Sequence, residues 1–464
     1  MNTQDTICAI ATAQGGAIGV IRISGKDAIA ITDRIFTPVG KHPLPLSERK
    51  AYTMAFGHIR QDDGEIIDEV LIGLFKSPHS YTGEDCVEIS CHGSSFILQQ
   101  VMQLLIRKGC RAAGPGEFTQ RAFLNGKMDL SQAEAVADLI ASSSAATHRM
   151  AMNQMRGGFS RELSALRERL LHLTSLMELE LDFSDHEDLE FADRSELETI
   201  AADIEKVISG LVRSFSVGNV LKNGIPVAIV GETNAGKSTL LNTLLNEEKA
   251  IVSDIHGTTR DVIEDTVNLS GITFRFIDTA GIRDTHDTIE NMGIARSFHK
   301  MEQAEIVLWV VDNTCAEAQI RQLSPRILPL CSNKQLIILL NKSDQVSAVP
   351  TKLSGLPENT VTLSISAKEK TGIQELQNLL VKTASVPELT SSDLIVTNVR
   401  HYEALSLALE DIHRVQNGLQ THLSGDFISQ DLRECLFHLA EIVGGEITAD
   451  EVLGNIFMKF CIGK

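Results

Sequence analysis

Between residues 223 and 386, short apolar runs alternate with segments of helical period. The runs are PVAIV, TFRFID, IVLWVVD, LIILLNK and VTLSIS. Strand–helix alternation is typical of a parallel sheet with helices on both faces. This part of the chain is therefore predicted to be an α/β domain.

Residues 1–126 combine short strand-like runs with glycine-rich turns. The runs at 16–25, 65–78 and 86–93 predict strands. Residues 95–109 have helical period and end at a glycine, which predicts a helix. The mixture indicates an α+β domain.

Helical period dominates residues 127–222 and 387–464. Each part has apolar side chains at three- and four-residue steps, which form one helix face: Leu163, Leu166, Leu170, Leu173 and Met177 in the first, and Leu405, Leu409, Ile412, Val415 and Leu419 in the second. Neither part is large enough to form a stable hydrophobic core by itself. We expect the two to pack together as one helical domain, with 223–386 inserted between them. The acidic stretch 182–190 is expected to be a solvated connection between helices.

The amino-acid composition limits the functions that this chain can be expected to have. The net charge of −19 argues against broad electrostatic capture of nucleic acid or of an anionic membrane, although a local basic patch stays possible. No signal peptide and no apolar run long enough for a transmembrane helix is present, and the eight cysteines lack zinc-site spacing. These features predict a cytoplasmic protein that does not bind membranes.

The stretch GETNAGKS, residues 231–238, carries the most specific chemistry. It matches GxxxxGK[ST] between an apolar run and a helical segment. Backbone N–H groups of such a loop wrap phosphates, and the helix N-terminus adds positive potential. Lys237 is expected to reach the β- and γ-phosphates, and Ser238 to ligate Mg²⁺.

Four further motifs follow in the order that guanine-nucleotide enzymes use. HGTTRD contains Thr258 and Thr259, which alone would indicate only a turn but here lie where a switch threonine would close over Mg²⁺. DTAG (278–281) would sense the γ-phosphate, NKSD (341–344) would read guanine through Asp344, and SAK (366–368) would support the base. The set predicts a GTPase, with an ATPase as the weaker alternative.

One expected group is missing. Ile282 follows DTAG, where Ras-type enzymes place a glutamine that orients water. Arg260, Arg275 and Arg283 lie nearby in sequence, but each is more typical of a structural or solvated arginine. The site must therefore stabilise the transition state in another way.

These motifs together resemble a known family. GETNAGKS, DIHGTTRD, DTAGIR, NKSD and SAK, with RISG, SYTGED, CHG, PGEFTQRAFLNGKMDLSQAEA and the final FCIGK, are similar to the tRNA modification GTPase MnmE (TrmE) family from about residue 5 to 464. The resemblance implies a tetrahydrofolate-binding and dimerisation domain over 1–126, a helical domain in two parts (127–222 and 387–464), and an inserted Ras-like P-loop G domain over 223–386.

The resemblance also implies an activity and partners. A homodimer would form a heterotetramer with the FAD-containing protein MnmG and act on tRNA. The complex would add an aminomethyl or carboxymethylaminomethyl group at C5 of the wobble uridine (position 34) of certain tRNAs. A 5-formyl- or methylene-tetrahydrofolate would supply the carbon. GTP hydrolysis would be stimulated by K⁺ and would involve dimerisation of the G domains.

Carried over residue by residue, the family pattern implies several sites. Folate contacts fall on Arg22, Glu88, Lys127 and Lys464. Mg²⁺ ligands fall on Ser238 and Thr259, and K⁺ ligands on Asn234, Ser253, Ile255 and Thr258. The remaining GTP contacts fall on Ala235, Gly236, Lys237, Thr239, Asp254, His256, Gly257, Asp278, Thr279, Ala280, Gly281, Asn341, Lys342, Asp344, Ser366, Ala367 and Lys368.

Two catalytic candidates lie outside these sets. Glu290 would orient or activate the attacking water. Cys461 could act as a nucleophile, because a thiolate attacks readily, but it could equally be a core cysteine beside Phe460 and Ile462.

The sequence departs from the family pattern at three places. The early glycine-rich turn AQGG lacks the Arg often found there, Ser94 replaces a Gly after CHG, and Ser253 replaces a common Thr.

Two other functions remain open from sequence. The G-domain motifs would also suit a GTPase switch that acts in ribosome assembly. Such a factor would be expected to carry a basic RNA-binding module, whereas this chain is acidic and ends in CIGK. A folate-dependent aminomethyl transferase that acts on protein is the third interpretation.

Overall fold

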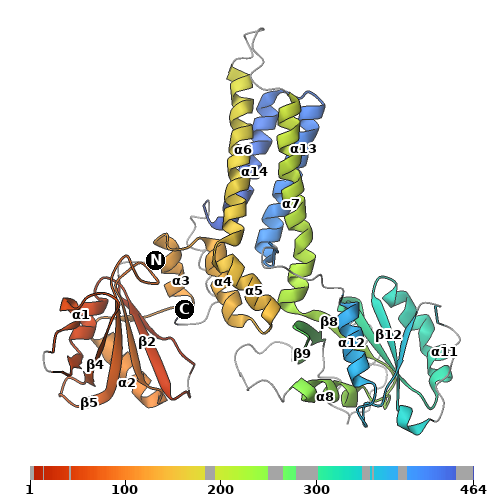
Figure 1. Cartoon of the computed structure of the whole chain (residues 1–464), viewed down its shortest axis with the longest axis horizontal. Coiled ribbons are helices and arrows are strands. Elements are labelled where there is room, and N and C mark those ends of the chain that lie inside the picture. The colour runs from red at the N-terminus through yellow and green to blue at the C-terminus, as the bar shows by residue number, and fades with distance from the viewer. Residues whose placement is uncertain are drawn as a thin grey trace. The chain divides into compact units, whose positions relative to one another are not determined.

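The computed structural model describes residues 5–13, 15–40, 43–182, 194–248, 265–277, 301–346, 356–357, 360–384, 394–445 and 463. The chain folds into two compact units (Figure 1). The first comprises residues 1–141, 151–209 and 403–464, and the second 142–150 and 210–402. No helix within the described ranges is both long and apolar enough to cross a membrane.

The N-terminal part of the first unit is built on a seven-stranded sheet in the order β3-β4-β5-β6-β2-β1-β7. Neighbouring strands are antiparallel except β1 and β7, which are parallel. The strands are β1 Ile7–Ile10, β2 Ile18–Ser24, β3 Phe36–Pro38, β4 Thr53–Arg60, β5 Ile66–Phe75, β6 Cys86–His92 and β7 Arg111–Ala112. The three predicted strands are thus confirmed as β2, β5 and β6, and the predicted helix as α2, Ser95–Arg107.

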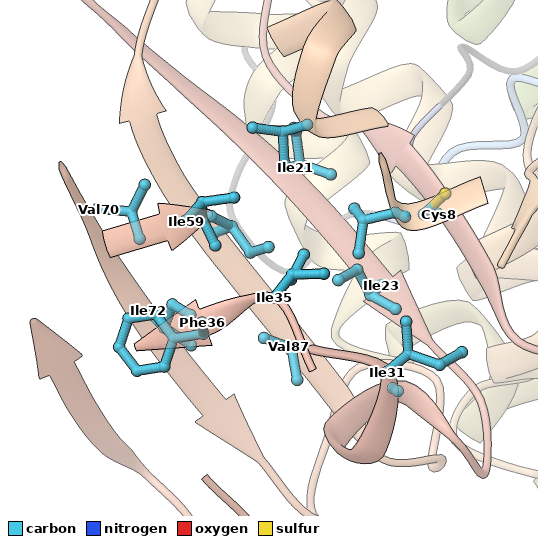
Figure 2. Packing of buried hydrophobic residues seen from close by; sticks show 14 of the residues in the cluster. Cys8, Ile21, Ile23, Ile31, Ile35, Phe36, Ile59, Val70, Ile72 and Val87 are labelled. Atoms are coloured by element: carbon cyan, nitrogen blue, oxygen red, sulfur yellow. The ribbon is translucent and has the colours of Figure 1, made fainter. Parts of the chain in front are cut away.

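One face of this sheet is covered by α1 (Ala28–Asp33) and α2. Figure 2 shows Ile21 and Ile23 of β2 packed with Val87 of β6 and Ile31 of α1, all buried. Because side chains alternate across a strand, the intervening residues face the other way. The opposite face accordingly leaves Met54, Phe56 and Leu71 exposed.

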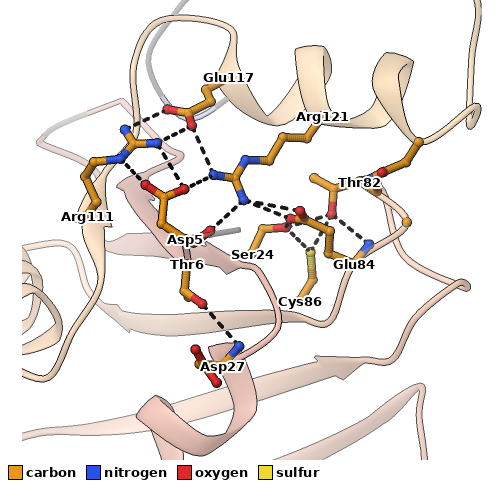
Figure 3. A network of polar contacts seen from close by, with 12 residues as sticks. Asp5, Thr6, Ser24, Asp27, Thr82, Glu84, Cys86, Arg111, Glu117 and Arg121 are labelled. Carbon is orange, nitrogen blue, oxygen red and sulfur yellow. Dashed lines mark hydrogen bonds and ion pairs between the residues drawn. The ribbon is translucent and has the colours of Figure 1, made fainter. Parts of the chain in front are cut away.

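A buried arginine organises the end of this domain (Figure 3). Arg121 of α3 (Glu117–Leu124) is only 3% exposed. It bonds Asp5 Oδ1 at 2.7 Å, Glu117 Oε1 at 3.1 Å and Glu84 Oε1 at 3.2 Å. Arg111 contacts the same Asp5 and Glu117 carboxylates at 2.6 and 2.5 Å. A buried charge is tolerable only when it is paired in this way.

The two sets of apolar helix faces are confirmed as buried. All five residues of the first lie on α6 and are buried, whereas Leu409 of the second is only partly buried. Helix α14 packs along α6 and is capped by Gly444, which has φ 87° and where a Cβ would lie 2.8 Å from Phe123 Cζ. The helices are α4 Leu130–Ala141, α5 Ala145–Met155, α6 Gly158–Asp182, α7 Arg194–Asn223, α13 Val399–Gln420 and α14 Gly425–Val443. The acidic stretch lies outside the described residues beyond Asp182.

The second unit holds a six-stranded sheet in the order β13-β12-β11-β8-β10-β9. All five predicted strands are present, as β8 and β10–β13, and they run parallel to one another. The elements are β8 Ile225–Val230, α8 Lys237–Glu248, β9 Asp265–Leu269, β10 Ile272–Phe276, β11 Ile306–Asp312, α11 Ala316–Ile327, β12 Gln335–Asn341, β13 Val361–Ser364 and α12 Ile373–Thr383.

The prediction of a wholly parallel sheet was wrong at one edge. Strand β9, which the sequence did not reveal, runs antiparallel to β10. Ser270 and Gly271 join the two strands with φ of 52° and 84°. A two-residue turn with both φ values positive forms a hairpin, whereas a parallel neighbour would need a long crossover.

The Arg121 cluster generates a stability prediction. Arg121→Met should lower the free energy of unfolding of this domain by about 3–5 kcal/mol near pH 7, because three carboxylates lose a buried partner. The Arg111 guanidinium holds the pKa of Asp5 below its usual 3.8. Burial would raise the pKa of Glu117, but bonds from Arg111 and Gly114 outweigh it and hold that pKa below 4.5.

Arg121 also lowers both folded-state pKa values, by less than Arg111 does, so its own contribution to stability is present above about pH 4.5 and is lost as pH falls. The difference between wild type and Arg121→Met should therefore shrink in acid. Urea unfolding followed by circular dichroism from pH 3 to pH 7 measures it, with the exposed Arg34→Met as control. A pH-independent difference would contradict the ion-pair explanation.

Candidate functional site

The loop 231–238, which its sequence predicts to bind phosphate and which is called the phosphate-binding loop, connects β8 to α8 in a conformation that its glycines permit. Gly231 has φ 147°, and a Cβ there would lie 2.2 Å from the Val310 carbonyl oxygen. Gly236 has φ 98° and would place a Cβ 2.1 Å from Asn341 Nδ2. Only glycine fits either position. The loop therefore lies directly against the C-terminal parts of β11 and β12.

Lys237, the first residue of α8, extends back over this loop. Its Nζ donates to the carbonyl oxygens of Gly231 at 2.9 Å and Glu232 at 2.7 Å. The ammonium group thus lies over the loop that would carry the phosphates. Ser238 and Thr239 follow in the first turn of α8.

Asn341 connects three loops through one side chain. Its Nδ2 donates to the Ala235 carbonyl at 2.8 Å, and its Oδ1 accepts from the Ala367 N–H at 3.0 Å. Asn341 is 3% exposed. The phosphate-binding loop, the NKSD motif and the SAK motif are thereby held at fixed spacing. Sequence reasoning assigned Asn341 to the nucleotide but missed this connecting role.

The residues predicted to bind guanine also lie together. Ser366 donates its hydroxyl to Asp344 Oδ1 at 2.6 Å. Lys342 pairs with Asp312 Oδ2 at 2.5 Å, at the end of the adjacent strand β11. Burial would raise the pKa of Asp312, but bonds from Lys342 and Thr314 outweigh it and lower that pKa. Lys368 differs from these, because it is 79% exposed and lies 3.6 Å from Glu369.

Sequence reasoning missed Asp312. The usable signal was its position at the end of an apolar strand, since Asp312 and Asn341 are register partners in β11 and β12. Parallel strands that end together bring the following residues to one edge of the sheet.

Many predicted site residues lie outside the described ranges. They are Ser253, Asp254, Ile255, His256, Gly257, Thr258, Thr259, Asp278, Thr279, Ala280, Gly281, Glu290, Cys461 and Lys464. Their roles stay predictions. No cluster of three or more His, Cys, Asp or Glu side chains that could hold a metal occurs among the residues that are described.

Two of the predicted folate contacts lie on the N-terminal sheet. Arg22 of β2 and Glu88 of β6 are register partners, and Arg22 Nε and Nη2 both lie 2.9 Å from Glu88 Oε1. The guanidinium carbon of Arg22 lies 5.3 Å from the Tyr81 ring centroid and 5.7 Å from that of Phe118. Tyr81 and Phe118 were not predicted, although both belong to motifs that carry the resemblance.

Gly463, the one described residue of the C-terminal CIGK sequence, lies beside Arg22. Arg22 Nη1 lies 3.5 Å from the carbonyl oxygen of Gly463, and a Cβ on Gly463 would lie 2.6 Å from the Ile10 carbonyl oxygen. Two predicted folate residues, Arg22 and Glu88, are thus in contact beside Gly463. The third, Lys127, donates to the Pro78 carbonyl at 3.0 Å.

Comparison with known proteins identifies the family. A model described as the MnmE helical domain matches residues 130–461, and one described as the GTP-binding protein TrmE N-terminus matches residues 6–127. The tRNA modification GTPase MnmE of Bacteroides thetaiotaomicron is 67% identical over 467 residues, covering 99% of this chain and 100% of that one. The chain belongs to the tRNA modification GTPase MnmE family.

Other similar proteins include the MnmE of Flavobacterium johnsoniae, which is 52% identical and covers 100% of both chains. Among solved structures, a variant of Era from Aquifex aeolicus bound to GDP and AlF₄⁻ is 27% identical. It covers 40% of this chain and 65% of that chain, with a TM-score of 0.26. As a member of the MnmE family, the chain is a GTP hydrolase with a GTP-binding G domain.

The position of Asn341 generates a prediction for nucleotide affinity. Asn341→Ala should weaken GTP binding about a hundredfold, because the Ala235 carbonyl and the Ala367 N–H both lose a buried partner and the loops separate. Titration with a fluorescent GTP analogue measures the affinity. The exposed Asn378→Ala on α12 is the control. An affinity within about twofold of wild type would show that the loops are held by other contacts.

Proposed function

We propose that this chain hydrolyses GTP in the course of modifying tRNA. With an FAD-containing partner, MnmG, it would add an aminomethyl or carboxymethylaminomethyl group at C5 of the wobble uridine (position 34). A tetrahydrofolate derivative would supply the carbon. The observation that carries the proposal is the coexistence, in a chain of the MnmE family, of the Asn341-linked nucleotide loops and the Arg22–Glu88 pair beside Gly463.

At the nucleotide site, each described residue has a chemical role that its position supports. Lys237 would meet the β- and γ-phosphates from across the loop. Asp344 would accept hydrogen bonds from guanine N–H groups, with Ser366 holding one of its oxygens in place. Ser238 would offer a hydroxyl oxygen to Mg²⁺, a ligand type that hard cations prefer. Thr259 would be the second Mg²⁺ ligand, and Glu290 would orient water.

A monovalent cation fits the other end of the loop. Asn234 has φ 65° and is exposed, so its side-chain oxygen is accessible beside the phosphates. Asn234 would hold K⁺ together with oxygens of Ser253, Ile255 and Thr258. When bound, K⁺ would supply the positive charge that the missing glutamine and arginine finger do not. Hydrolysis would also involve pairing of two G domains.

At the predicted folate site, the contacts favour a ligand with polar N–H groups. Glu88 is partly exposed, and Arg22 holds one of its oxygens, so its carboxylate can accept from a pterin. Lys127 and Lys464 would contact folate carboxylates. Cys461 is the candidate nucleophile of this site. We further propose a cytoplasmic homodimer through the N-terminal domains, assembled with MnmG.

The tRNA proposal is tested in a strain that lacks the gene and is complemented with variants. Glu88→Gln should leave the wobble uridine unmodified, because a neutral amide neither pairs with Arg22 nor binds cationic or donor groups as strongly. GTP hydrolysis by purified Glu88→Gln should persist, since Glu88 and the nucleotide loops belong to different compact units. Nucleoside analysis of tRNA measures the modification.

Glu69→Gln, an exposed carboxylate on the neighbouring strand β5, is the matched control. Full modification with Glu88→Gln would remove Glu88 from the site. Unchanged tRNA in the deletion strain itself would overturn the function and favour the ribosome-assembly switch.

The cation proposal predicts a salt-specific rate. At equal ionic strength, GTP turnover should be at least about tenfold faster in K⁺ than in Na⁺, which corresponds to roughly 1.4 kcal/mol in the barrier. Na⁺ is smaller and fits a ring of oxygens sized for K⁺ less well. Asn234→Ala should abolish the difference. Equal wild-type rates in both salts would exclude a K⁺ role, whatever the variant does.

A further inference from the structure

A chain of hydrogen bonds leads from the phosphate-binding loop to the guanine motif through α11. Gln319 Nε2 donates to Glu232 Oε2 at 2.8 Å, and Gln319 Oε1 accepts from the Asp312 N–H at 2.9 Å. The Asp312 carboxylate pairs with Lys342 of NKSD. None of Glu232, Asp312 and Gln319 was among the predicted nucleotide contacts.

The orientation of the Gln319 amide is determined by the backbone. The Asp312 N–H can only donate, so the amide oxygen of Gln319 must face it. The amide nitrogen then has to face Glu232. Gln319 is 8% exposed, and its own N–H bonds the Cys315 carbonyl at the start of α11. The donor that meets Glu232 is therefore built into the fold.

Glu232 is an unusual residue to find at this position on electrostatic grounds. It follows Gly231 directly in a loop whose ligand carries several negative charges. A carboxylate that turned toward those phosphates would repel them. The bond to Gln319 instead holds the carboxylate toward α11, while the Glu232 carbonyl oxygen accepts from Lys237.

We propose that Gln319 is a positioning residue for GTP: it holds the Glu232 carboxylate on the α11 side of the loop, and so keeps a negative charge from opposing the phosphates. The inference rests on GTP binding at this loop and deepens it. Gln319 touches neither phosphate nor base; it acts through Glu232.

The decisive variant is Gln319→Glu in the full-length protein. Its side chain keeps the size of glutamine and can still accept from the Asp312 N–H, but it presents an oxygen to Glu232 instead of a donor. At pH 8 the two carboxylates repel, and Glu232 is released from α11. GTP affinity should fall about tenfold or more, and affinity for guanosine, which has no phosphates, should fall much less.

The exchanged pair tests the mechanism. Adding Glu232→Gln to Gln319→Glu restores a donor facing a carboxylate, with the bond reversed and the net charge of the pair unchanged. GTP affinity of this double variant should return to within about threefold of wild type. Raising the salt concentration should also reduce the loss in the single variant, because the repulsion is screened. Gln374→Glu, an equal charge change on the exposed face of α12, should have no effect.

Several outcomes would overturn the proposal. Equal losses for guanosine and GTP, no rescue in the double variant, or wild-type affinity in Gln319→Glu would each show that Gln319 does not act through the Glu232 charge. If Gln319→Glu failed to fold and Glu232→Gln did not restore folding, Gln319 would be a packing residue only. Failure of the wild type to bind GTP would instead overturn the nucleotide site itself.

Discussion

The nucleotide site depends on the side-chain amide of one buried asparagine. Asn341 satisfies a carbonyl of the phosphate-binding loop and an N–H of the SAK loop, and both partners lie more than twenty residues away along the chain. A buried polar group without a partner is costly, so separating either loop from Asn341 would raise the free energy of the folded state. Gly236 belongs to the same arrangement, because a side chain there would collide with the Asn341 amide. The motif residues that seem independent in sequence are therefore parts of one hydrogen-bonded unit.

The elements of this unit were predictable because each has a local signal. The strands are continuous apolar runs, and the loop is marked by two glycines and a lysine at fixed spacing. Strand β9 was missed because DTVNL contains few β-formers and its turn, Ser270–Gly271, is not among the strongest hairpin signals. Asp312 and Gln319 were missed for a different reason. Their partners come from other strands and helices, and the register of β11 against β12 decides which side chains meet.

The N-terminal sheet also shows that the sequence alone does not reveal which side chains meet. The resemblance implied folate contacts at Arg22 and Glu88 without relating the two residues to each other. In the structure they bond each other across β2 and β6, so Arg22 orients the carboxylate of Glu88. Arg121 is a second example. Its motif, PGEFTQRAF, supported the resemblance to the family but predicted no role for Arg121. In the structure, Arg121 pairs with Asp5, Glu84 and Glu117 and contributes to the packing of the domain (Figure 3).

The chain enters and leaves the main part of the second unit through two segments that contact each other. They are the last turns of α7, from residue 210, and the residues up to Tyr402 at the start of α13. A Cβ on Gly218 would lie 2.0 Å from the Val396 carbonyl oxygen, and the Val396 N–H donates to Ser214 Oγ at 3.0 Å. Phe215 and Tyr402 stack with centroids 4.4 Å apart. Because strand β8 follows α7 after a single glycine, Gly224, and the phosphate-binding loop follows β8, the nucleotide site is joined to α7 by one strand.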